Sequence, residues 1–269
     1  MIPGISSETE LVLAACLHPD VTSLRAETLN DRPIMLLNAT DAEARRLGIE
    51  FLGGPSLIVA VTDPDRPLGS IRAQTVGENN LLFFDNAGWG GNFHANIRIF
   101  GSDCLGFFND IGNEYVAIQD VLLRGNHQIL FWGIGASAVG LSIELEGSGR
   151  GLLVGDDALI SNGVWVRNYD MHALHDLKTG AQINRAPVDT VIERHVWLGQ
   201  DAILLNCERI GMGSVIGARA LVKGVIPPRV VAVGTPARVV RQDVSWGRHP
   251  YGMTDEERTA IGLPKLAEG

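Results

Sequence analysis

Two histidines and two aspartates lie close together in a polar segment at residues 167–190. The segment reads RNYDMHALHDLKTGAQINRAPVDT, with Asp170 two residues before His172 and Asp176 directly after His175. An imidazole that titrates near neutral pH can remove the proton of a hydroxyl nucleophile. A nearby carboxylate can orient that imidazole or bind the substrate. We therefore predict that His172 is a general base and that Asp170 serves it in one of these two roles.

His175 and Asp176 repeat the same residue types just downstream. We expect both to be ordinary loop residues. Contact of His175 with the substrate stays open as the alternative.

A six-residue period in the aliphatic residues predicts the element that positions this segment. Its most regular positions are Ile192, Leu198, Leu204, Ile210, Ile216 and Val222. A helix repeats its apolar face about every 3.6 residues and a strand about every 2, whereas hexapeptide coils repeat every six. Glycine follows three of these positions, and it suits the tight corners between short strands. We predict a mainly β chain folded as a left-handed parallel β-helix, a hexapeptide-repeat solenoid.

The polar segment interrupts that period. The interval between Val166 and Ile192 is not a multiple of six. A solenoid expels such insertions as loops on one face, often the binding face. We therefore predict an expelled loop at about residues 167–191.

The period also divides the chain. A fainter six-residue series begins near Asn79 and contains Ile99, Leu105, Ile111, Ala117, Leu123 and Ile129. We predict a small α/β cap at residues 1–75, the β-helix at 76–245 and a tail with a short helix at 246–269. The cap would hold helices starting with the capping boxes Ser7–Glu10 and Thr40–Glu43, strands at PIMLLN and SLIVAVT, and a βαβ arrangement. The tail helix would start at the capping box Thr254–Glu257 and end at Gly262.

The composition excludes several classes of function. The 269 residues carry a formal net charge of -9, and a chain this acidic is a poor nucleic-acid binder. We find neither a signal-peptide pattern nor an apolar stretch long enough to span a membrane, so we expect a cytoplasmic protein. Cys16, Cys104 and Cys207 are scattered without CxxC spacing, which predicts reduced thiols.

Four sequence segments carry a family resemblance. GLLVGDDALISNGVWVRNYDMHALHD, HVWLGQDAILL, IGMGSVIGARALVKG and VAVGTPARVVR follow one another in the last two thirds of the chain. With these motifs the chain resembles the hexapeptide-repeat O-acetyltransferases, particularly those acting on capsule and O-antigen polysaccharides. The resemblance implies a homotrimer with active sites between neighbouring subunits, acetyl-CoA along the C-terminal coils, and His172 as the base. It does not explain residues 1–70. Glu208 departs from the family pattern, because a glutamate stands at a position that should face inward. We therefore expect either a bulge there or a buried partner for its side chain.

The resemblance also implies roles for residues on the coils. The main-chain amide of Gln200 would donate to the thioester oxygen and stabilise the oxyanion. The indole of Trp197 would offer area to the pantetheine arm, and Gly199 would let the cofactor approach the backbone. The predicted cofactor-binding residues are Trp197, Gly199, Gly217, Ala218, Lys223 and Arg238, with Arg219 and Arg241 as further cationic candidates for phosphate.

Together these patterns predict an acetyl-CoA-dependent O-acetyltransferase. His172 would deprotonate a hydroxyl of a sugar or polysaccharide precursor, which attacks the thioester directly, and we expect no metal. One alternative is a metal-dependent, carbonic-anhydrase-like hydratase on the same solenoid, using some of the histidines His94, His127, His172, His175 and His195. Another is a non-catalytic β-helix scaffold.

Overall fold

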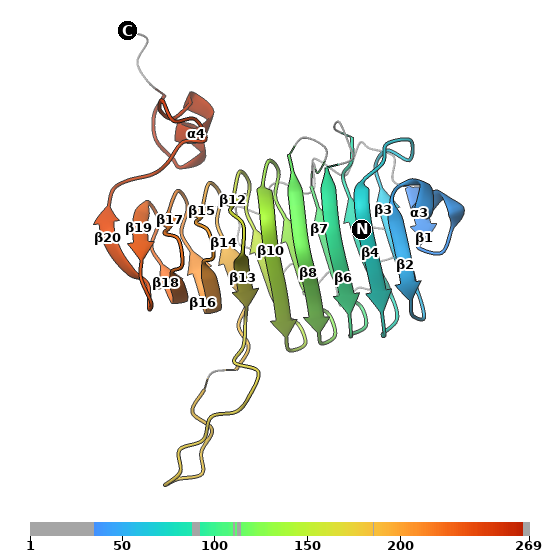
Figure 1. Ribbon diagram of the computed structural model, residues 1–269, viewed down its shortest axis with the longest axis horizontal. Helices are drawn as coiled ribbons and strands as arrows, with labels where there is room; N and C mark the ends of the chain where they lie inside the picture. Colours follow the sequence, from blue (N-terminus) through green and yellow to red (C-terminus); the bar gives the residue numbers. More distant parts are fainter. Residues whose placement is uncertain (1–34, 88–91, 110, 112–113, 185, 266–269) are drawn as a thin grey trace.

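The computed structural model describes residues 35–87, 92–109, 111, 114–184 and 186–265, and in them the chain forms a parallel β-solenoid (Figure 1). Its strands pair in parallel from coil to coil. This confirms the predicted mainly β, hexapeptide-repeat fold. The predicted tail helix begins with the expected capping box of Thr254 and Glu257, so that element is confirmed too.

The strands lie on three walls. The first wall contains β2 (Ile49–Gly53), β4 (Gly69–Thr75), β6 (Phe93–Ile99), β8 (Val116–Arg124), β10 (Ser137–Glu146), β13 (Val164–Arg167) and the starts of β16 (Ile203–Ile210) and β18 (Leu221–Ile226). The second contains β3 (Leu57–Val61), β5 (Asn80–Phe84), β7 (Leu105–Phe108), β9 (Ile129–Trp132), β11 (Gly151–Val154), β14 (Thr190–Ile192) and the ends of β16 and β18. The third contains the start of β10, then β12 (Leu159–Ile160), β15 (Trp197–Leu198), β17 (Val215–Ile216) and β19 (Val230–Val233).

The coils become shorter along the chain. Gly69 pairs with Phe93 on the next coil, whereas Leu204 pairs with Val222 after a shorter interval. The shorter coil consists of three hexapeptides, so the six-residue period is regular where the coils are short. All six aliphatic positions from Ile192 to Val222 are at most 1% exposed, as the period predicts.

The early series does not share one face, contrary to our expectation. Ile99 and Leu123 face the interior of the solenoid, but Leu105 and Ile129 belong to a second buried cluster on the other side of the second wall. Ala117 is partly exposed. The interval from Gly69 to Phe93 is also a multiple of six, so positions one early coil apart stay in register although positions six apart do not.

The second cluster runs across successive strands of the second wall. Phe83 stacks on Phe107, and Phe107 on Phe131, with ring centroids 4.4 and 5.6 Å apart.

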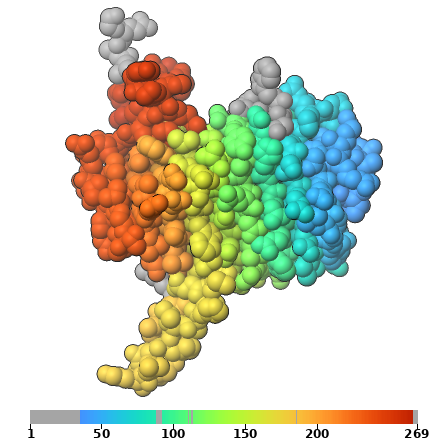
Figure 2. Space-filling model, viewed as in Figure 1, coloured from blue at the N-terminus to red at the C-terminus, as the bar shows by residue number. Residues whose placement is uncertain are grey.

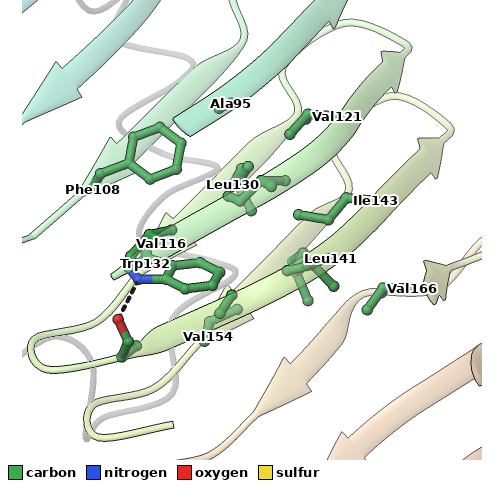
Figure 3. Close-up of a cluster of buried hydrophobic side chains, with 14 of the residues drawn as sticks. Ala95, Phe108, Val116, Val121, Leu130, Trp132, Leu141, Ile143, Val154 and Val166 are labelled. Atoms are coloured by element: carbon green, nitrogen blue, oxygen red, sulfur yellow. Dashed lines mark hydrogen bonds between the residues drawn. The ribbon is translucent and has the colours of Figure 1, made fainter. Parts of the chain in front are cut away.

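Buried side chains also fill the interior of the solenoid. Trp132, fully buried among aliphatic side chains, donates from Nε1 to the carbonyl of Ala136 over 3.1 Å (Figure 3). Strands β5, β7, β9 and β11 are therefore buried on both faces.

The N-terminal elements differ in detail from the prediction. Strand β1 (Met35–Asn38) pairs antiparallel with β3, so the two do not form a parallel βαβ unit. Helix α3 (Ala42–Arg46) has Asp41 at its N-cap, and the hydroxyl of Thr40 donates to Asn38 instead of capping the helix. The Ser7–Glu10 capping box lies outside the described residues. Parallel pairing already joins β2 to β4, and the division of the chain at residue 75 stays a prediction.

The C-terminal elements close the other end of the solenoid. Strand β20 (Arg238–Gln242) turns back antiparallel on β19, and helix α4 (Asp255–Ala260) follows. Gly262 has a φ of +74°, as expected of a residue that ends a helix. The predicted irregularity near Glu208 is also present: the register of β16 against β18 shifts on either side of Cys207, which is buried while Glu208 is exposed.

Candidate active site

A long loop leaves the solenoid between β13 and β14, and its base is fixed by Asn168. Residues 168–189, the extended loop, project from the body on the side opposite α4 (Figures 1 and 2). The buried amide of Asn168 donates to the carbonyls of Glu146 and Val188, both over 3.0 Å. Its oxygen accepts from the Glu146 N–H over 2.8 Å. One side chain therefore ties both ends of the loop to the preceding coil.

His175 and Asp176 stabilise the far turn of this loop. The carboxylate of Asp176 accepts from the N–H groups of Thr179 and Lys178 and from the Thr179 hydroxyl, over 2.8 to 3.0 Å. The hydrogen bonds from Thr179 contribute most to lowering the pKa of Asp176. His175 lies within 3.2 Å of the Gly180 carbonyl through Nδ1 and pairs with Gln182 in an isolated antiparallel bridge. These contacts suit the expected role of ordinary loop residues.

His172 is held through its backbone, and its ring is exposed. Asn184 donates to the His172 carbonyl over 3.0 Å and accepts from the Leu174 N–H over 3.0 Å. The His172 N–H donates to the carbonyl of Asp170. Among the described residues no hydrogen bond joins the Asp170 carboxylate to the imidazole. The fold thus fixes the main chain of His172 and leaves its ring accessible.

A cavity of about 420 Å³ opens at the base of the loop. It is lined by Asp170, Leu174, Ile183, Asn184, Asn206, Lys223 and Gly224. Asn206 was not among the predicted site residues, although its position in the coil after the loop could have indicated it. Asn206 has a φ of +50°, a conformation that asparagine tolerates better than most residues.

The other predicted site residues gather at a different corner. Trp197, Gly199 and Gln200 follow one another between β15 and β16, and Gly217 and Ala218 occupy the same corner one coil later. We call these five residues the Trp197 corner. The indole of Trp197 is 37% exposed.

Close backbone contact explains the glycine at this corner. A Cβ at Gly199 would lie 2.7 Å from the N atom of Ala218, so a larger residue would displace the next coil. The carbonyl of Gln200 accepts from Arg219 over 2.8 Å, and no hydrogen bond from the Gln200 N–H occurs among the described residues. That amide is therefore available to a ligand.

The remaining cationic candidates are spread over the last coils. Arg219 lies 3.6 Å from Asp201, and Arg238 donates to the carbonyl of Ala237 over 2.8 Å. Arg238 and Arg241 are exposed on β20. Lys223 lies at the loop cavity and not in the Trp197 corner.

The third corner holds a network that sequence analysis missed. His195 is buried there, and its Nδ1 lies 2.6 Å from Asp157. Its Nε2 lies 2.8 Å from the carbonyl of Trp246. Burial acts to raise the pKa of Asp157, but hydrogen bonds from His195 and Arg248 lower it below its usual value. The network ties the C-terminal tail to the solenoid.

Within one chain, the predicted catalytic residues are not all brought together. His172 and Asp170 lie on the loop between the first and second walls, whereas Gln200 lies between the third and first walls. Among the described residues no three His, Cys, Asp or Glu side chains gather as a metal site requires. No described helix is long and apolar enough to cross a bilayer.

Comparison with known proteins places the chain in a family. The polysialic acid O-acetyltransferase of Neisseria meningitidis is 30% identical over 166 residues, which cover 54% of this chain and 77% of that protein. The chain belongs to the hexapeptide-repeat O-acetyltransferases. This membership confirms the resemblance to an acyltransferase family that the sequence motifs indicated. No family model matches the chain.

Further members of the family align over shorter stretches. The galactoside O-acetyltransferase of Escherichia coli (strain K12) is 35% identical over 36% of this chain and 47% of its own length. That of Lactococcus lactis is 41% identical over 34% and 43%. The matched region thus spans less than half of these two relatives.

Solved structures of two family members share the fold. The polysialic acid O-acetyltransferase OatWY matches with a TM-score of 0.55 at 21% identity, over 78% of this chain and 95% of its own. The polySia-specific acetyltransferase NeuO matches with a TM-score of 0.51, also at 21% identity, over 78% and 89%.

Proposed function

We propose that this chain transfers an acetyl group from acetyl-CoA to a hydroxyl of a sugar or polysaccharide precursor. The observation that carries the proposal is the placement of His172. Its backbone is fixed by Asn184, which lines the cavity together with Asp170, and its side chain is exposed. Relatives named as galactoside and polysialic acid O-acetyltransferases support a sugar acceptor.

The proposed reaction is a direct transfer with His172 as general base. The imidazole takes the proton of the acceptor hydroxyl as its oxygen attacks the thioester carbonyl. The N–H of Gln200 stabilises the resulting oxyanion. When the intermediate collapses, the C–S bond breaks, and the imidazolium returns the proton to the CoA thiolate. The acetyl group moves to the acceptor oxygen without a covalent enzyme intermediate.

The donor would lie along the Trp197 corner. The exposed indole of Trp197 offers apolar area to the pantetheine arm, and Ala218 is exposed on the next coil, against which Gly199 is buried. Arg238, exposed on the last strand, is the cation proposed for a CoA phosphate. Acetyl-CoA is here a substrate.

The separation of His172 and Gln200 within one chain supports an active site between subunits. A loop carrying His172 could complete the Trp197 corner of a neighbour in a closed ring, with the same contact repeated at each interface. We propose a homotrimer on this basis. The cytoplasmic location stays a prediction.

The test compares His172→Ala with His175→Ala. Each protein is incubated with acetyl-CoA and a galactoside or polysialic acid, and free thiol and acetylated product are measured. We expect His172→Ala to lower kcat by about 10²- to 10⁴-fold, since general base catalysis contributes that much. His175→Ala, which removes one exposed hydrogen bond, should stay near the wild-type rate. Full activity of His172→Ala would contradict the assignment.

A further inference from the structure

The cavity at the base of the extended loop is lined by Asn206, whose amide oxygen is a buried hydrogen-bond acceptor. Asn206 is 4% exposed, and its Oδ1 has no hydrogen-bond partner among the described residues. The pairing of Arg167 with Leu205 places Asn168 at the equivalent position one coil earlier. The amide of Asn168 is fully used by backbone groups. This difference between Asn206 and Asn168 matters because a buried polar group without a hydrogen-bond partner costs free energy, and a ligand or a water usually supplies the partner.

The remaining lining residues combine polar and apolar groups. Asp170 contributes a carboxylate, and Lys223 contributes an ammonium group that has no ion pair among the described residues. Leu174 and Ile183, from the two arms of the loop, are 57% and 64% exposed. A volume of about 420 Å³ falls within the range of about 300 to 1,000 Å³ of small-molecule sites.

A sugar ring matches this lining better than a purely apolar ligand does. It presents hydroxyl donors and acceptors around its edge and C–H groups on its faces. The carboxylate and the amide oxygen accept from hydroxyls, the ammonium donates, and the two aliphatic side chains can cover a face.

We propose that this cavity binds the sugar ring of the acceptor, with Asn206 as a specificity-determining residue that accepts a hydrogen bond from a ring hydroxyl. This inference rests on the proposed function and adds the place and chemistry of the acceptor site. It assigns Asp170 to the substrate and not to the imidazole. It also places Lys223 on the acceptor side, whereas the sequence resemblance placed it with CoA. Asn184 lines the cavity and donates to the His172 carbonyl, so a ring held here would lie near the proposed base.

The test uses Asn206→Gly, because glycine accepts the positive φ and removes the side chain that carries the amide. Asn79→Gly is the matched control: Asn79 is exposed, has a φ of +57° and lies on an early coil far from the loop. Binding of methyl galactoside and of a sialic acid oligomer to the full chain is measured by calorimetry without acetyl-CoA. We expect one of these sugars to bind wild type and Asn79→Gly equally, and Asn206→Gly about three- to tenfold more weakly.

Steady-state kinetics separate the two substrates. Asn206→Gly should raise KM for the sugar and leave KM for acetyl-CoA unchanged. Equal sugar binding by Asn206→Gly and wild type, or failure of wild type to bind either sugar at about 10 mM, would overturn the acceptor site. A raised KM for acetyl-CoA alone would assign the cavity to the donor. Because binding is measured without acetyl-CoA, a chain that binds sugar but transfers no acetyl group would refute the proposed function and keep this site.

Discussion

The indole ring of Trp246 stacks on the imidazole of His195, with ring centroids 4.3 Å apart and planes inclined by 7°. The two residues also exchange hydrogen bonds: Trp246 Nε1 donates to the His195 carbonyl over 2.9 Å, and His195 Nε2 lies 2.8 Å from the Trp246 carbonyl. The same indole lies 6.0 Å from the ring of Trp197. The C-terminal tail is therefore locked to the solenoid beside a residue of the proposed donor site.

We predict that Trp246→Ala destabilises the protein and frees the tail. The substitution removes a buried indole and its hydrogen bond to the His195 carbonyl, and losing a buried Trp side chain typically costs about 3 to 5 kcal/mol. Chemical denaturation should show this loss, and limited proteolysis should cut near residue 246. Trp165→Ala is the control, because Trp165 is partly exposed on β13. An unchanged unfolding midpoint for Trp246→Ala would show that the tail contributes nothing to stability.

Asp157 makes the attachment of the C-terminal tail through His195 and Trp246 depend on pH. Its pKa lies below the ordinary value of 3.8 because hydrogen bonds from His195 and Arg248 outweigh the effect of burial. A carboxyl whose pKa is lower when folded stabilises the protein above its unfolded pKa and loses that effect as the pH falls. We expect Asp157→Asn to cost about 1 to 3 kcal/mol at pH 7. The difference from wild type should shrink below about pH 4, as followed by denaturation at several pH values. A difference that grows on acidification would contradict this account.

The two described cysteines should be chemically inert in the folded protein. Burial raises the pKa of the Cys104 thiol to about 11 and that of Cys207 to about 12. Since the thiolate is the reactive form, iodoacetamide at pH 8 should leave both unmodified in the native state and modify both after denaturation. Peptide mass spectrometry reads this directly. Rapid labelling of Cys207 in the native state would contradict this prediction.

Local periodicity was enough to predict the late coils. Six aliphatic positions in phase from Ile192 to Val222 specify coils of three hexapeptides, and all six are buried. The break in the period before Ile192 lies where the extended loop leaves the solenoid. The longer early coils place Leu105 on the opposite face from Ile99, which a fixed period cannot reveal.

Contacts between distant residues could not be read from the sequence. The network of His195 with Asp157 and Trp246 joins separate coils and the tail, so it depends on how the coils stack. Asn206 could not be predicted in the same way, because only folding buries its side chain and leaves Oδ1 without a partner in the described part of the chain. Motif spacing predicted His172 and Asp170 as candidates but not their separation from Gln200 within the chain.

In the proposed trimer, a loop from one subunit and a Trp197 corner from another form each active site. His172→Ala removes the base, and Ala218→Trp blocks the corner at an exposed position without changing the loop. In a mixed trimer, one interface can combine the intact loop of the second variant with the intact corner of the first.

The most direct measurement is acetyl transfer by His172→Ala and Ala218→Trp chains, refolded separately or together in equal amounts. Each variant alone should be nearly inactive. Random co-assembly should restore about a quarter of the wild-type activity, because about one interface in four joins the two intact halves. Mixed trimers, verified by mass, that stay as inactive as the separate variants would contradict a site shared between subunits.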